Sequence, residues 1–237
     1  MASSRRDFLR SSTALALGAG IAGRASAQGL SVPHWPSASA VPSAVDPHAK
    51  ELALRALDAA RSAGAQYADV RITAGRTQNI FTRERRVAGI NDRETFGFGV
   101  RTLVDGAWGF AASSDVTAEE VTRVARQAVE QARANRAAQL RPVTLAPTEP
   151  VPNGVWRAPA RIDPFDVDLQ DKAELLLAAN EAALGVKGAR FVNSSMFFLR
   201  DEKTYANTEG SVITQTIYRA QPSMTVTAVS SDMADFQ

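Results

Sequence analysis

The sequence predicts an α+β fold, in which an antiparallel or mixed sheet is flanked by helices and followed by a β-meander that begins a second domain. Two observations predict this class. Segments with apolar residues at helical spacing are interspersed with segments that alternate apolar and polar residues at period two. Their order is helix, several strands and helix, and then, after a proline-rich stretch, one helix followed only by strands.

The composition is that of a globular protein. The chain has 237 residues, of which 45% are hydrophobic and 22% charged, so it is long enough to bury a core. It contains no cysteine. The sequence therefore has no disulfide framework, no thiolate metal site and no cysteine nucleophile.

Residues 1–27 have the organisation of a twin-arginine signal peptide. Ser4–Arg10 reads SRRDFLR, a weakly apolar run follows from Ala14 to Ala22, and Ala25-Ser26-Ala27 forms an A-x-A cleavage site. The apolar run is too short to cross a bilayer, which needs about 20 residues. We therefore expect export to the periplasm or beyond, without stable membrane insertion.

Removal of this segment changes the charge balance. Residues 1–27 carry four arginines and one aspartate, whereas the whole chain has a net charge of only +2. The expected mature chain has a net charge of −1. A basic composition therefore gives no support for nucleic-acid binding, and none is expected.

Residues 28–46 are predicted to be a linker and residues 47–139 an N-terminal α+β domain. Asp46-Pro47 begins a helix that ends near Gly64. A capping box at Thr117–Glu120, with reciprocal side-chain bonds from Thr117 and Glu120, begins a second helix that reaches about Ala138. The strands predicted between these helices are 67–73, 77–81, 85–90 and 95–104, with a return strand through Ala111.

Residues 140–167 are predicted to be an extended connector without regular structure, because six of the eleven prolines lie there. Residues 168–237 are expected to be a helix plus a β-meander, the start of a truncated C-terminal region. Asp168 caps the helix and Gly185 ends it, and Asn207–Gly210 forms a turn between strands. The strands predicted in this region are 191–200, 203–206, 211–218 and 223–230.

The chain offers few catalytic groups. Its two histidines, His34 and His48, lack the spacing of a zinc site and are interpreted as solvated. Carboxylate groups at Asp115/Glu119/Glu120 and Asp166/Asp168/Asp171 are explained by helix N-termini, and Asp201/Glu202 by a tight turn. No catalytic, cofactor-binding or metal-binding residue is therefore assigned.

The stretch Gly97–Ala111, GFGVRTLVDGAWGFA, is predicted to be a β-hairpin with its turn at Asp105-Gly106. Thr102 stands where a dinucleotide-binding loop has its third glycine, which argues against that motif. Alternation places one set of residues on a trough-like face: Gly97, Gly99, Arg101, Leu103, Trp108 and Phe110. Either a ligand approaches the two glycines of this face or a helix packs over them, and both interpretations stay open.

Three motifs in this order resemble the TldD/PmbA family, whose members were historically labelled modulators of DNA gyrase. They are Tyr67–Arg71 (YADVR), the hairpin GFGVRTLVDGAWGFA and Lys203–Gly210 (KTYANTEG). The similarity spans about residues 48–230, and the sequence of the hairpin is more similar to the TldD branch than to the PmbA branch.

The resemblance implies a zinc metallopeptidase that acts on peptides or unfolded chains and pairs with a PmbA/TldE-like subunit or with a second copy of itself. In the family, an HExxxH motif in the C-terminal half binds the metal, with a further cysteine ligand. This sequence contains neither HExxxH nor cysteine. We therefore expect an inactive N-terminal portion of such an enzyme, in which zinc belongs to the full-length protein and none is bound by this chain.

Two alternatives remain: a non-catalytic PmbA/TldE-like scaffold subunit, and a periplasmic peptide-binding module. An in-frame HExxxH beyond Gln237 would support the peptidase interpretation, and its absence would support the scaffold. The sequence leaves open the substrate, the oligomeric state and the origin of the truncation.

Overall fold

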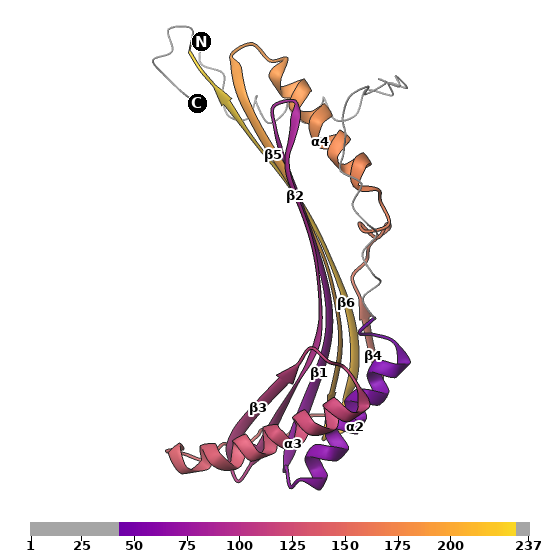
Figure 1. Ribbon diagram of the computed structural model, residues 1–237, viewed down its shortest axis with the longest axis vertical. Helices are drawn as coiled ribbons and strands as arrows, with labels where there is room; N and C mark the ends of the chain where they lie inside the picture. Colours follow the sequence, from indigo (N-terminus) through magenta and orange to yellow (C-terminus); the bar gives the residue numbers. More distant parts are fainter. Residues whose placement is uncertain (1–42, 231–237) are drawn as a thin grey trace. The chain divides into compact units, whose positions relative to one another are not determined.

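The computed structural model describes residues 43–230, so the expected signal peptide and most of the expected linker lie outside the described residues. The described part is α+β, as predicted, with one six-stranded sheet in the order β3-β2-β1-β5-β6-β4 (Figure 1). The helices are α2 (Pro47–Ser62), α3 (Ala118–Asn135), the 3₁₀-helix η1 (Arg136–Ala138) and α4 (Leu169–Leu184). The strands are β1 (Tyr67–Arg83), β2 (Arg86–Val104), β3 (Ala107–Ser113), β4 (Gly154–Arg157), β5 (Ala189–Asn207) and β6 (Val212–Ala228).

The four long strands correct the shorter strands predicted from sequence. The predicted 67–73 and 77–81 form one strand, β1, because this strand is paired along its length with β2 on one side and with β5 on the other. The predicted pairs within β2, β5 and β6 merge in the same way. Strands from before and after the connector therefore belong to one sheet.

Polar residues and a proline that were expected between strands lie within the paired strands instead. Asp201 and Glu202 lie within β5, opposite Gly75 and Ala74 of β1, and not in the expected tight turn. Pro222 lies in β6 beyond the segment that pairs with β4. A missing N–H is tolerated at an outer edge of this kind.

The hairpin turn at Asp105-Gly106 is confirmed. Both residues have positive φ, 48° and 78°, as a two-residue type I′ turn requires. The observed pairs Arg101–Phe110, Leu103–Trp108 and Val104–Ala107 match the predicted register.

The helices begin where their caps predict. Asp46 accepts a hydrogen bond from the Ala49 N–H at 2.7 Å, and Thr117 accepts one from the Glu120 N–H at 3.3 Å. The reciprocal half of the expected capping box is wrong, because the Glu120 carboxylate binds Arg123 instead, at 2.7 Å. The Asp168 side chain makes no capping hydrogen bond either, although α4 starts directly after it.

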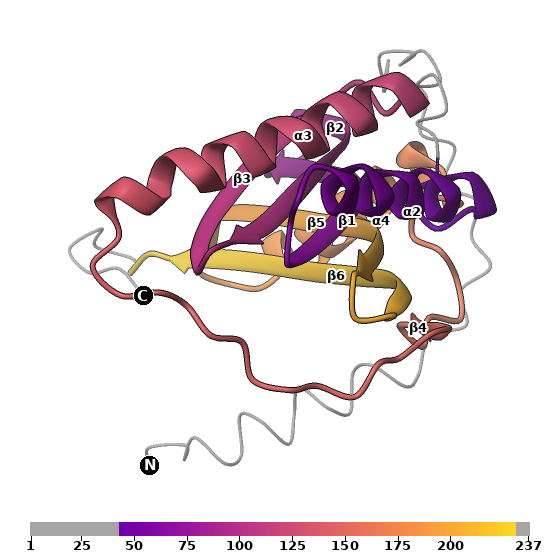
Figure 2. The same ribbon diagram turned by 90° about the horizontal axis from the view of Figure 1, so that it is seen from below.

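Two apolar clusters join the helices to the sheet. The larger lies between α2, α3 and one face of the sheet, and Figure 2 shows these two helices side by side over the strands. It includes Val70 and Ile72 of β1 and Val100 of β2, all 0% exposed. The smaller cluster lies under α4 and contains Ile80, Ala173, Leu176 and Phe198.

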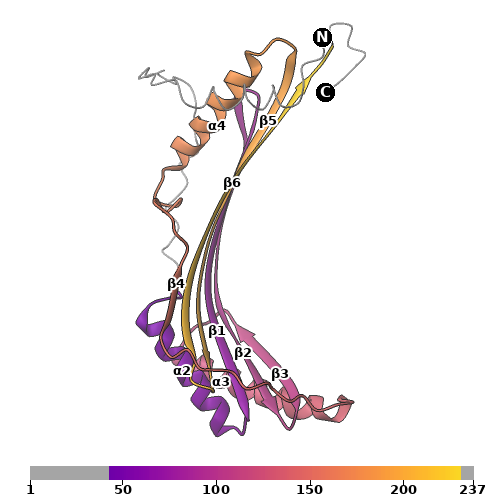
Figure 3. The same cartoon turned by 180° about the vertical axis from the view of Figure 1, so that it is seen from behind.

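The connector is more ordered than predicted. Residues Gly154–Arg157 form the short strand β4, which pairs in parallel with β6. Before β4, the Val143 N–H donates to the Gly106 carbonyl and the Val151 carbonyl accepts from Val212, which ties the connector to the β2–β3 turn and to the start of β6 (Figure 3). Within residues 43–230, no helix has the length and apolar character needed to cross a membrane.

Candidate functional site

The two faces of the sheet differ in chemistry. The helix face carries Val70, Ile72 and Val100 and packs against α2 and α3. Alternation places Asp69, Arg71, Arg101 and Tyr205 on the other face, named here the arginine face. Figure 2 shows α2 and α3 together over one face of the sheet.

Asp69 is the centre of the arginine face. Its side chain is 0% exposed and contacts two arginines. Arg101 Nε donates to Asp69 Oδ2 at 2.8 Å, and Arg101 Nη2 lies 2.7 Å from the same oxygen. Arg71 Nη1 lies 2.9 Å from Oδ1, but not along a hydrogen-bond direction, so Oδ1 accepts no directed bond. The buried carboxylate therefore holds both guanidinium groups in place.

Aromatic rings fix the two arginines from the sides. The Arg101 guanidinium lies 4.5 Å from the centre of the Trp108 ring, and that of Arg71 lies 5.4 Å from the centre of Tyr205. Trp108 in turn makes an edge-on contact with Tyr67, with ring centres 5.9 Å apart. Such contacts contribute about 0.5–1 kcal/mol each at exposed sites.

The tyrosine hydroxyls of this face form hydrogen bonds. The hydroxyls of Tyr67 and Tyr205 lie 3.2 Å apart, and the Asn207 amide donates to Tyr205 at 3.2 Å. Burial raises the pKa of Tyr67 above its ordinary value, and the bond to Tyr205 and the charge of Asp69 raise it further. The cluster therefore offers positive charge and neutral donors, a combination suited to binding an anion.

A hollow opens beside Arg71, over the two glycines singled out in the sequence. Its lining includes Arg71, Thr73, Gly97, Gly99, Phe110 and Ser113. A Cβ at Gly99 would lie 2.8 Å from the Phe110 ring, and one at Gly97 would lie 3.0 Å from the Ser113 carbonyl oxygen. Of the two interpretations left open for these glycines, the packed helix is wrong, because their close neighbours come from β3 and Ser114. The glycine that admits a helix is Gly109, which packs against α3.

A second polar cluster lies on the helix face beside α4. Arg76 donates to both carboxylate oxygens of Asp92, at 3.1 and 2.9 Å, and Lys172 Nζ donates to Gln78 Oε1 at 2.7 Å. Burial opposes ionisation of Asp92, but hydrogen bonds from Arg76 and Gln78 outweigh it and lower the pKa of Asp92. Burial lowers the pKa of Lys172, whose amine lies 4.6 Å from the Phe198 ring centre. Lys172 is only 5% exposed, so its bond to Gln78 joins α4 to β1 inside the protein.

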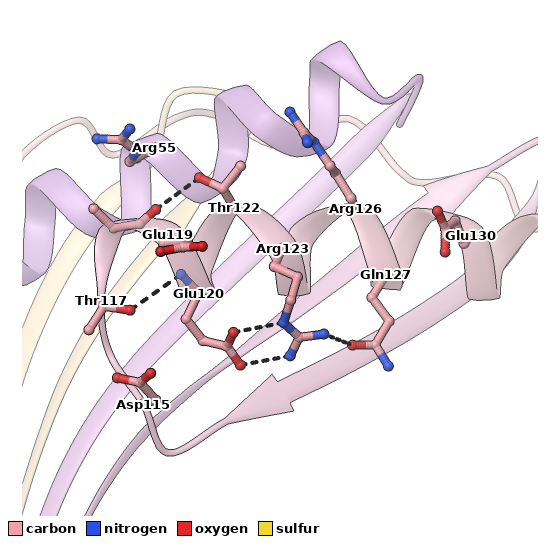
Figure 4. A pocket seen from close by; sticks show the side chains of 11 residues that line it. Arg55, Asp115, Thr117, Glu119, Glu120, Thr122, Arg123, Arg126, Gln127 and Glu130 are labelled. Carbon is pink, nitrogen blue, oxygen red and sulfur yellow. Dashed lines mark hydrogen bonds and ion pairs between the residues drawn. The ribbon is translucent and has the colours of Figure 1, made fainter.

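A charged hollow lies along α3 and next to Arg55 of α2 (Figure 4). One ion pair lies within it: Arg123 pairs with Glu120 at 2.7 Å and donates to Gln127 at 3.0 Å. The bond to Arg123 lowers the pKa of Glu120 to about 2. Glu119 and Glu120 lie in the first turn of α3, where carboxylates interact favourably with the helix dipole.

The described residues do not form a metal site. Within residues 43–230, no three His, Asp or Glu side chains are grouped so that they could hold a metal ion. His48 is exposed and lies 3.7 Å from Glu51, whereas His34 lies outside the described residues. Glu202 accepts hydrogen bonds from Ser43 and from the Ala44 N–H.

Sequence reasoning missed the Asp69 cluster. It placed Arg101 on the correct face but assigned no role to Asp69 or Arg71. The signal was present, since aligning β1 against β2 sets Asp69 opposite Arg101 and Arg71 opposite Gly99.

Two family models match the chain. Residues 68–132 match the model described as PmbA/TldA metallopeptidase domain 1, and residues 162–236 match the PmbA/TldA metallopeptidase central domain. Together these matches cover more than half of the chain.

Curated relatives and solved structures agree with these models. The chain is 26% identical over 172 residues to a metalloprotease from Methanothermobacter thermautotrophicus, covering 73% of this chain and 36% of the relative. A metalloprotease from Methanocaldococcus jannaschii is 26% identical over 111 residues, covering 47% of this chain and 24% of the relative. The chain thus matches well under half of the length of each relative.

Among solved structures, TldE from Thermococcus kodakarensis superposes with a TM-score of 0.63 at 15% identity, over 76% of this chain and 40% of that chain. A protein described as a candidate modulator of DNA gyrase from Bacteroides thetaiotaomicron gives a TM-score of 0.61 at 18% identity, over 80% of this chain and 43% of that chain. At these identities the structures show a shared fold.

Proposed function

Because the chain belongs to the PmbA/TldD metallopeptidase family, we propose that it is the N-terminal, non-catalytic portion of an exported TldD-like zinc metallopeptidase that acts on peptides or unfolded chains. The observation that carries this proposal is the consecutive match of domain 1 and the central domain to residues 68–132 and 162–236. Relatives named metalloproteases support the reaction class.

Zinc is the metal that the family implies. The described residues bring together no set of zinc ligands, and the sequence has no HExxxH motif. The proposed role of this portion is therefore to bind and orient a polypeptide. It requires no chemical step by residues 43–230.

The sheet offers edges at which an extended peptide can add as a strand. β6 pairs with β4 only at residues 213–216, so within the described part of the chain residues 217–228 have no strand on their outer side. At the opposite edge, side chains of α3 occupy β3: Gln131 accepts from the Phe110 N–H and Asn135 donates to the Trp108 carbonyl, both at 2.9 Å. Beyond β3, residues 86–97 of β2 also have no strand on their outer side within the described part of the chain. We assign strand addition to β6, where backbone hydrogen bonds supply affinity without sequence selectivity.

Assembly with a PmbA/TldE-like subunit or with a second copy is part of the same proposal, and it is supported by family membership. The fold likeness to TldE does not distinguish a catalytic-type chain from a scaffold chain. The experiment that tests the proposal measures two properties of the full chain together: binding of an unfolded polypeptide, and its cleavage in the presence of added zinc.

Export by the twin-arginine pathway completes the proposal. Replacing Arg5 and Arg6 together by lysine is expected to retain the protein in the cytoplasm, because the pathway reads the paired guanidinium side chains. Fractionation followed by immunoblotting measures this, and replacement of Arg10 by lysine is a control within the same segment. Undiminished export of the double variant would contradict the assignment.

A further inference from the structure

We propose that Arg71 and Arg101 form a binding site for the free C-terminal carboxylate of a peptide. This inference rests on the proposed function, since it names the part of the ligand that the arginine face recognises.

The charge balance of the cluster favours an additional anion. Two guanidinium groups share a single carboxylate, that of Asp69, so one positive charge among the three groups is uncompensated. The carboxylate is 0% exposed, whereas the side chains of Arg71 and Arg101 are 43% and 41% exposed. The remaining N–H donors of both arginines are therefore accessible, while the group that positions them is not.

The guanidinium groups are held in position before any ligand binds. Asp69 fixes them on one side, and the rings of Tyr205 and Trp108 lie against them on the other. A planar guanidinium binds a carboxylate through two parallel N–H bonds. Because the arginine side chains are already ordered, binding costs little side-chain entropy, and more of the interaction energy contributes to affinity.

The hollow beside Arg71 has room for the last side chain of the peptide. Gly97 adds no side chain to its lining, and the Phe110 ring, which is 55% exposed and lies against Gly99, provides an apolar wall. A terminal residue places its side chain and its carboxylate on the same carbon. This geometry favours a chain end with an apolar side chain over an acidic side chain in the middle of a peptide.

The test measures binding of three fluorescein-labelled hexapeptides to the full chain by fluorescence anisotropy. The first ends in leucine with a free carboxylate, the second is the same peptide amidated, and the third is amidated with an internal glutamate. We expect the first to bind about 10-fold or more tightly than the others, the range for a charge-assisted hydrogen bond.

Arg71→Gln is expected to reduce binding of the free-acid peptide to the level of the amidated one. Arg71→Lys, which keeps the charge but lacks the planar fork, is expected to recover part of the loss and so separates recognition from misfolding. Arg93→Gln is the matched control, because Arg93 is an exposed arginine on the same face of β2. It is expected to leave binding unchanged.

Equal binding of the free-acid and amidated peptides would overturn the carboxylate site while leaving the proposed function intact. Equal binding of the free-acid and internal-glutamate peptides would overturn the assignment to the chain end. Failure of all three peptides to bind would contradict both this inference and the proposed function.

Discussion

Replacement of Gly109 by alanine is expected to lower the free energy of unfolding by about 3 kcal/mol, near the upper end of the range for overpacked sites. A Cβ at this position would lie 2.0 Å from the Ala128 carbonyl oxygen and 2.5 Å from the Ala132 nitrogen. Both atoms belong to the backbone of α3, so no side-chain rotation relieves the clash. The helix must move away from β3, which disrupts the larger apolar cluster.

Urea unfolding and thermal melting of the full chain measure this effect, and the expected fall in Tm is about 6–12 °C for a protein of this size. Gly89→Ala is the matched control, because Gly89 lies in β2 and a Cβ there meets nothing within 4 Å. The control is expected to be neutral or slightly stabilising. Equal stability of the two variants would show that α3 does not pack on Gly109 as described.

Replacement of Asn180 by alanine is the second large expected loss of stability, also about 3 kcal/mol. Asn180 is 0% exposed, and its amide joins α4 to β1, to the turn after β1 and to β5. It donates to Thr82 Oγ1 at 3.1 Å and to the Glu84 carbonyl at 2.8 Å, and it accepts from Ser194 Oγ at 2.7 Å. The alanine variant leaves these buried groups without that partner, at a cost of about 1–3 kcal/mol for each group left unsatisfied.

The Thr82 and Ser194 hydroxyls still bond to each other, at 2.6 Å, which limits the loss. Gln170→Ala removes an amide from an exposed position of the same helix and is expected to change stability by less than about 0.5 kcal/mol. Chemical denaturation of both variants provides the comparison. A loss below about 1 kcal/mol for Asn180→Ala would mean that the network does not hold α4 on the sheet.

Local signals in the sequence predicted the helices and the hairpin well. Asp46, Thr117 and Gly185 mark helix ends in the sequence and in the structure. The Asp105-Gly106 dipeptide fixed both the turn and the register of β2 against β3. These features depend on neighbouring residues alone, and so they can be read without knowledge of the tertiary structure.

Features that depend on distant pairing could not be read in this way. The strands extend through polar and glycine positions because β1 is paired on both sides. Lys172 and Asn180 lie on the buried side of α4, although polar side chains of an amphipathic helix normally face solvent. The bond between Asp69 and Arg101 joins residues 32 positions apart, and it follows only from the strand register.

Under the proposed function, the chain binds polypeptides without cleaving them, and one experiment measures both properties. The full chain is mixed with a fluorescent unfolded polypeptide and added zinc, and binding is followed by anisotropy while mass spectrometry records the length of the polypeptide. The polypeptide is expected to bind and to stay intact, with and without a chelator. Cleavage that the chelator abolishes would show a working metal centre in this chain, and absence of binding would show that it does not bind polypeptides; either result would contradict the proposed function.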